Sequence, residues 1–146
     1  MRKFIIAMMA MLFGGAIYIL WRSDTLLMFT WFDVMGIRDH VLSLQSFAKP
    51  CYAVLPHWVL YSLPQALWLF SGIVAFSCIW GKEDALNRSL WSTIFAVTAL
   101  GFELGQFLDI IPGHFDKWDM VSMFLALAVA CFVCALENRC ERCKCK

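Results

Sequence analysis

The sequence predicts an all-α protein, a polytopic transmembrane helical bundle with about four spans. Of its 146 residues, 62% are hydrophobic and only 16% are charged, whereas a soluble domain has about 45–50% and about 25% respectively. Apolar runs of roughly 20 residues recur along the chain, which is the length a helix needs to cross the hydrocarbon core. Seven tryptophans suit the aromatic belts at the two membrane surfaces.

The first expected span runs from Phe4 to Trp21, behind a basic start. Gly14 and Ala16 are small enough for a signal-peptide cleavage site. The apolar run continues past them as "IYILW", which favours an uncleaved helix. The Gly14–Gly15 pair is then a point where a second helix can approach closely.

The next segment, Asp24 to Pro56, is apolar but interrupted by charge. The interrupting residues are Asp33, Arg38, Asp39, His40 and Lys49. This pattern predicts an amphipathic or partly re-entrant segment at the membrane interface and not a further span.

Three more spans are expected after this interfacial segment, at His57–Trp80, Leu90–Leu108 and Phe115–Leu136. Residues 1–138 would form one transmembrane domain, followed by a basic, cysteine-containing tail at 139–146. With the N-terminus inside, eight lysines and arginines fall on the inner side and four on the outer. The positive-inside rule therefore places both termini in the cytoplasm and the turn between the last two spans outside.

That turn is acidic and lies in the stretch "FELGQFLDIIPGHFDKWDM". Glu103 lies about 9 Å inward from Asp109 on one helix, and Asp119 about 6 Å down the next. Pro112 and Gly113 reverse the chain between them. A charged carboxylate facing lipid costs about 2.5–3.5 kcal/mol at the membrane centre, so both carboxyls should point into the bundle and share one outward-opening pocket.

Two carboxyls in one pocket would compete for a single proton. The predicted catalytic or cation-binding residues are therefore Glu103 and Asp119, with His114 from the turn. Gln106, Asp116 and Gln65 are the predicted ligand-binding residues, Gln65 because it lies deep in the second span, next to Pro64. Simpler roles stay open: Asp116 as a helix cap, the two acids as an interhelical clamp, and the glutamines as packing contacts.

The motif E-LG-Q followed by PGHFDKWD resembles the signature of the VanZ-like membrane family. Glu103, Gln106, Asp116 and Asp119 match that pattern directly. The family's arginine is His114 here, which is cationic only at lower pH, and its asparagine and small glycine are Met123 and Ala126. The resemblance implies a small helical bundle in a bacterial cytoplasmic membrane. The family name comes from glycopeptide (teicoplanin) resistance and implies no defined reaction.

The chain ends in "RCERCKCK", with three thiols at Cys140, Cys143 and Cys145. Zinc normally takes four ligands, so Cys134 or a partner would have to supply the fourth. Stable disulfides are not expected in the cytoplasm. A basic tail that contacts anionic headgroups is the simpler interpretation.

Three functions are compatible with these features. The first is an outward-facing acidic cavity that binds or modifies an envelope amphiphile: a glycolipid, a cell-wall precursor or a lipoglycopeptide. The second is a non-enzymatic membrane subunit whose acids clamp its helices while its surface docks a membrane protein partner. The third is metal handling by the cysteine tail. Membrane lipids are expected neighbours in each case, and the net charge of +1 gives no reason to expect nucleic acid. The sequence identifies no cofactor and no metal ligands within the spans.

Overall fold

A computed structural model describes residues 2–23, 26–80 and 84–144, with side chains up to residue 135. Within these residues the chain is helical and contains no strand. The elements are α1 (Arg2–Trp21), α2 (Leu27–Val34), α3 (Arg38–Ala48), the 3₁₀ helix η1 (Lys49–Ala53), α4 (His57–Ile79), α5 (Ala85–Phe107) and α6 (Lys117–Lys144). The prediction of an all-α fold is therefore confirmed.

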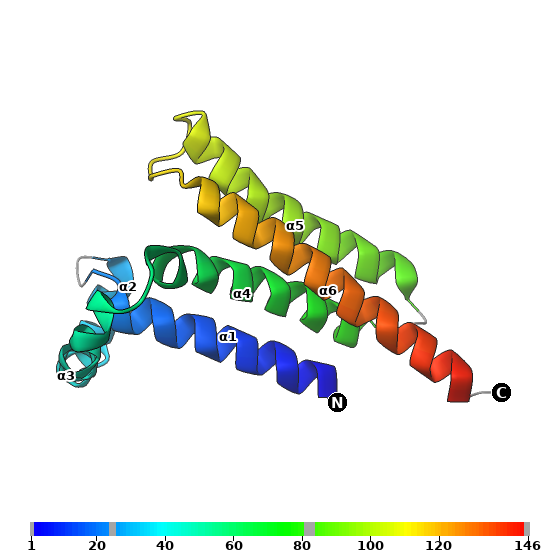
Figure 1. The fold of residues 1–146 in the computed structure, drawn as a ribbon, viewed down its shortest axis with the longest axis horizontal. Helices are drawn as coiled ribbons and strands as arrows, with labels where there is room; N and C mark the ends of the chain where they lie inside the picture. Colours follow the sequence, from blue (N-terminus) through cyan, green and yellow to red (C-terminus); the bar gives the residue numbers. More distant parts are fainter. Residues whose placement is uncertain (1, 24–25, 81–83, 145–146) are drawn as a thin grey trace.

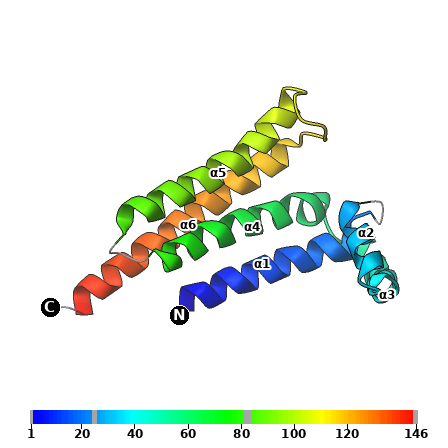
Figure 2. The ribbon, with the colours of Figure 1, turned by 180° about the vertical axis from the view of Figure 1, so that it is seen from behind.

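Four long helices run up and down the length of the molecule, and the chain reverses direction at each connection (Figure 1). Both ends of the chain lie at the same end of this bundle. The short helices α2 and α3 lie at the opposite end, as does the turn between α5 and α6, and the view from behind shows the same arrangement (Figure 2). The acidic turn and the segment predicted to be interfacial therefore share one end of the protein.

Helix α4 forms the centre of the bundle, because it packs against α1, α5 and α6. Its contact with α1 is close at Gly14, where an added Cβ would lie 3.2 Å from the Pro64 carbonyl oxygen. Nearby, the Ser71 hydroxyl donates to the Ala7 carbonyl at 2.7 Å. Small residues and interhelical hydrogen bonds of this kind hold helices together in lipid. The predicted close approach occurs at Gly14 but not at Gly15, which has no such neighbour within 4 Å.

The contacts of α4 with α5 and α6 use the same devices. Gly72 of α4 leaves room for the Phe95 ring of α5, which packs edge-to-face on Phe76 with ring centroids 5.7 Å apart. On the other side, the Ser122 hydroxyl of α6 donates to the Ser62 carbonyl at 3.3 Å. Met123 of α6 is buried in the same core.

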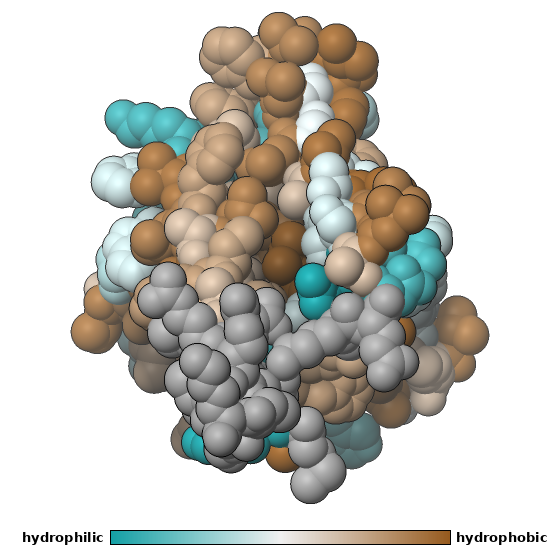
Figure 3. Space-filling model, turned by 90° about the vertical axis from the view of Figure 1, so that its right-hand side faces the viewer, coloured by the Kyte–Doolittle hydropathy of each residue, from teal (hydrophilic) through white to brown (hydrophobic). Residues whose placement is uncertain are grey.

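Three described helices are long and apolar enough to cross a membrane: α1, α4 and residues 117–135 of α6. Of their apolar windows, 44% is buried in α4 but only 17% in α1 and in α6. Apolar side chains cover much of the visible surface in Figure 3. These features are compatible with a multi-pass membrane protein whose outer helices face lipid.

The connections differ in detail from the sequence prediction. The interfacial segment is mostly helical, and Gln45 of α3 ties it back to α1 by donating to the Ile19 carbonyl at 2.8 Å. Helix α5 begins at Ala85, before the apolar run, because the Asp84 side chain accepts a hydrogen bond from the Asn87 backbone and caps it. Helix α6 continues to Lys144, through most of the predicted tail. The side chains of Cys140, Cys143 and Cys145 lie outside the described residues.

Candidate functional site

Glu103 and Asp119 are two of the few polar residues buried in this bundle. Glu103 is 4% exposed and lies four residues before the end of α5, whereas Asp119 is 6% exposed and is the third residue of α6. The two helices are joined by a turn, so both carboxyls lie near the same end of the bundle (Figure 1). Glu103 and Asp119 are close enough for a direct charge interaction.

Helix α4 contributes the third polar group. The Gln65 side chain lines the same cavity as Glu103. Four buried side-chain oxygens around this point have no hydrogen-bond partner among the described residues: Ser62 Oγ, Gln65 Oε1, Glu103 Oε2 and Asp119 Oδ1. Buried polar atoms in native proteins are nearly always satisfied. This group can therefore accept further hydrogen bonds, because amide oxygens and ionised carboxylate oxygens are acceptors.

A cavity of about 210 Å³ lies beside these groups, between α4, α5 and α6. Its polar lining comes from Gln65 and Glu103, and its apolar lining includes Trp68, Phe95, Phe102 and Met123. Carboxylate and amide oxygens can hold a cation or accept hydrogen bonds from hydroxyl or ammonium groups. The aromatic and thioether side chains can pack against a ring or an alkyl chain.

The other predicted site residues lie around the turn. Asp116 accepts a hydrogen bond from the Trp118 backbone amide at 3.0 Å, so it caps α6, one of the two roles the sequence left open. The Gln106 side chain lies over Gly113, where an added Cβ would come within 2.5 Å of its amide nitrogen. His114 is exposed in the turn, and no hydrogen bond or ion pair within the described chain joins it to either buried acid. Of the predicted residues, Glu103 and Gln65 line the cavity and Asp119 is buried at the same end of the bundle, whereas Asp116 and Gln106 belong to the turn and do not line the cavity.

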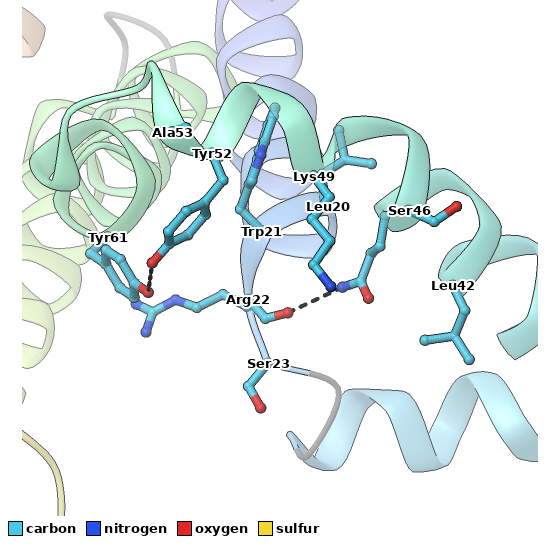
Figure 4. A pocket seen from close by; sticks show the side chains of 11 residues that line it. Leu20, Trp21, Arg22, Ser23, Leu42, Ser46, Lys49, Tyr52, Ala53 and Tyr61 are labelled. Carbon is cyan, nitrogen blue, oxygen red and sulfur yellow. Dashed lines mark hydrogen bonds between the residues drawn. The ribbon is translucent and has the colours of Figure 1, made fainter.

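A second, larger pocket was not predicted from the sequence. It has a volume of about 680 Å³ and lies between the end of α1, α3, η1 and the start of α4. Arg22, Lys49, Tyr52 and Tyr61 contribute its polar groups (Figure 4). The sequence signal for this pocket is limited to Arg22 and Lys49, which lie near the two ends of the segment between the first two predicted spans. From the sequence alone, these residues contribute only to the charge count that assigns the orientation. Among the side chains the structure describes, no group of three His, Cys, Asp or Glu could hold a metal ion.

Comparisons with protein-family models, with curated proteins and with solved structures found no match to this chain. The resemblance to the VanZ-like family therefore stays a prediction that rests on the motif residues.

Proposed function

We propose that this chain is a four-span protein of a bacterial cytoplasmic membrane, and that the cavity beside Glu103 and Asp119 binds an envelope amphiphile. In this arrangement α5 is the fourth span. Its 23 residues extend about 34 Å, enough for a hydrocarbon core of about 30 Å. It is less apolar than its neighbours partly because it carries Glu103, but that carboxyl faces the bundle and not lipid.

The orientation follows the excess of lysine and arginine on the side of the two termini. Both termini are then cytoplasmic, and the acidic turn and the interfacial helices α2 and α3 lie on the outer side. The motif shared with the VanZ-like family supports the same placement in the bacterial envelope. A ligand of the cavity would therefore come from the outer leaflet or from outside the cell.

One observation carries the proposed ligand class: the buried Glu103 carboxyl and the Gln65 amide, each with an unused acceptor oxygen, line a cavity whose other walls are mostly apolar. Asp119, a second buried carboxyl with an unused oxygen, lies at the same end of the bundle but does not line the cavity. Such a site matches a molecule with hydrogen-bond donors at one end and an apolar body. Sugar hydroxyls and ammonium groups are donors that suit a carboxylate. A glycolipid, a cell-wall precursor or a lipoglycopeptide fits this description, and no reaction is assigned to the site.

Native mass spectrometry of the full-length protein in tetraethylene glycol monooctyl ether tests this proposal, because that detergent has no sugar to compete. The probes are monoglucosyldiacylglycerol and teicoplanin, with diacylglycerol as the matched lipid without a sugar. The wild type should bind at least one sugar-bearing probe saturably and more tightly than diacylglycerol. Glu103→Gln and Asp119→Asn should each weaken this binding about tenfold or more, the effect of losing a hydrogen bond to a charged group.

Asp109→Asn is the matched control, since Asp109 is an exposed acid of the same turn and its positive φ of 56° suits asparagine. It should bind the probes as the wild type does. If neither sugar-bearing probe binds better than diacylglycerol, or if the two buried-acid variants bind like Asp109→Asn, the proposed binding site is wrong.

A second function, a helix clamp within a membrane subunit, is favoured by the hydrogen bond that the Ser122 hydroxyl of α6 donates to the Ser62 carbonyl of α4. This bond joins α4 to α6 three residues after Asp119. A clamp predicts that Glu103→Gln and Asp119→Asn lower the free energy of unfolding and leave the binding of both probes unchanged. The same two variants therefore separate the two functions.

A further inference from the structure

The larger pocket is distinct from the acidic cavity and has the opposite charge. Arg22 and Lys49 contribute two positive charges to its lining, and none of its lining residues is acidic. The one described ion pair at this end joins Arg38 to Asp33 at 3.5 Å, and neither residue lines the pocket. The pocket is therefore positively charged.

Arg22 is held in place by aromatic rings. Its guanidinium carbon lies 5.2 Å from the centre of the Tyr18 ring and 4.7 Å from that of Tyr61. Cation–π contacts use the face of the guanidinium and leave its edge N–H groups free to donate. In agreement, the buried Arg22 Nε has no hydrogen-bond partner among the described residues. A fixed guanidinium with spare donors suits an anion with several oxygens.

Two tyrosine hydroxyls add a further donor. The hydroxyls of Tyr52 and Tyr61 lie 3.2 Å apart, and either can donate to the other (Figure 4). One such bond uses one of the two hydroxyl protons. The other proton stays available for an acceptor in the pocket.

Hydrogen bonds within the chain fix the walls of this pocket. Gln45 of α3 donates to the Ile19 and Arg22 carbonyls at 2.8 and 3.1 Å, and the Trp21 indole donates to the Ala48 carbonyl at 3.2 Å. These bonds fix α3 against the end of α1. A preformed site loses less entropy on binding than one that must be ordered.

We propose that this pocket binds a phosphate-bearing group, with Arg22 and Lys49 as the charged contacts and the tyrosine hydroxyls as additional donors. Its volume of about 680 Å³ lies within the range of small-molecule sites, about 300–1,000 Å³. Leu20, Trp21 and Leu42 supply apolar walls beside the charges, which suits the glycerol and first methylenes of a phospholipid as well as free phosphate. The proposal stands on its own and requires no ligand in the acidic cavity.

The test uses the full-length protein in tetraethylene glycol monooctyl ether micelles, with phosphatidylglycerol as the probe and diacylglycerol as the same lipid without phosphate. Native mass spectrometry should show saturable binding of phosphatidylglycerol, at least about tenfold tighter than that of diacylglycerol, since charged hydrogen bonds to phosphate make the difference. Arg22→Gln should weaken phosphatidylglycerol binding about tenfold or more. Arg38→Gln is the matched control and should change it less than about twofold.

A competition with inorganic phosphate distinguishes the two sources of the group. Displacement of phosphatidylglycerol by millimolar phosphate supports a site for phosphate itself, and tight lipid binding that phosphate does not displace supports a headgroup site. No preference over diacylglycerol, or equal effects of Arg22→Gln and Arg38→Gln, overturns the proposal. If Arg22→Gln fails to fold, Lys49→Gln replaces it, because Lys49 is exposed. A folded Lys49→Gln protein with wild-type binding would then overturn the proposal.

Discussion

Replacing Gly72 by alanine should weaken the packing of α4 against α5. A Cβ at this position would overlap Cε1 of the Phe95 ring and lie 2.7 Å from its Cζ, well inside van der Waals contact. The ring cannot retreat freely, because it packs edge-to-face on Phe76 with centroids 5.7 Å apart. Overpacking of this kind costs about 1–3 kcal/mol, and the helix preference of alanine returns about 0.5–1 kcal/mol. The Gly72→Ala substitution should therefore lower the free energy of unfolding, by up to about 2.5 kcal/mol.

Gly101→Ala is the control, since a Cβ there would meet no neighbouring atom within 4 Å. It should leave the stability unchanged or raise it by about 0.5–1 kcal/mol. The assay is reversible unfolding in mixed micelles with an increasing fraction of sodium dodecyl sulfate, followed by far-ultraviolet circular dichroism. Equal effects of Gly72→Ala and Gly101→Ala would refute the contact between Gly72 and Phe95.

A double-mutant cycle with Phe95→Leu tests the same contact directly. Shortening the side chain removes the ring atoms that meet the new methyl group, so the Gly72→Ala substitution should cost less in the Phe95→Leu background. We expect a coupling energy of at least about 1 kcal/mol. Phe95 also lines the acidic cavity, so the ring that packs α5 against α4 is at the same time one wall of the site.

Three further variants test one hydrogen bond between helices and two at helix starts. Ser71→Ala removes the bond of 2.7 Å to the Ala7 carbonyl and should cost about 0.6–1.7 kcal/mol in the same unfolding assay, whereas Ser46→Ala, which loses only an exposed local bond, should be neutral. Asp116→Ala removes the cap of α6 and should cost about 1 kcal/mol, most of which Asp116→Ser should restore. The hydrogen bond from the Asn87 side chain, followed by that from its backbone, lowers the pKa of Asp84 below its ordinary 3.8. Asp84 therefore stabilises the fold above that pH, and this contribution should fall as the pH drops through the lowered pKa. The measurement is the melting temperature of the wild type and of Asp84→Ala as a function of pH. An equally steep loss of melting temperature in acid for both proteins would contradict this role.

The ends of two spans were predicted well because the sequence marks them sharply. The first helix ends at Trp21 and α4 begins at His57, as expected, next to Arg22 and Pro56. Charged residues and proline interrupt an apolar helix at the same place that hydropathy falls. For these helices the hydropathic boundary and the helical boundary coincide.

Elsewhere the two boundaries differ. Helix α5 begins five residues before the predicted span, because its start is fixed by the cap at Asp84 and not by the first apolar residue. Helix α6 begins two residues late, after its cap at Asp116, and continues past the predicted Leu136 into charged sequence. Hydropathy indicates where lipid ends, but a charged sequence can continue a helix into water.

The two polar sites differed in how far the sequence revealed them. Glu103 and Asp119 are separated by one short turn, so their depths could be counted along two adjacent helices. The basic pocket depends on contacts such as that of Gln45 with Ile19, which are 26 residues apart and have no periodic signature. A charge count locates Arg22 and Lys49 on one side of a membrane but does not bring them together.

Helix α4 explains how opposite charges coexist at one end of a small bundle. Tyr61 and Gln65 are four residues apart, about 6 Å along the helix, and each is a neutral side chain that lines one of the two sites. The Tyr61 ring lies against the Arg22 guanidinium, and the Gln65 amide lines the acidic cavity beside Glu103. An Arg22–Glu103 ion pair would neutralise both sites at once, and none is present among the described residues. Because the α4 side chains in both sites, Tyr61 and Gln65, are neutral, α4 forms no ion pair with either Arg22 or Glu103. Both sites therefore keep hydrogen-bonding groups that a ligand would need.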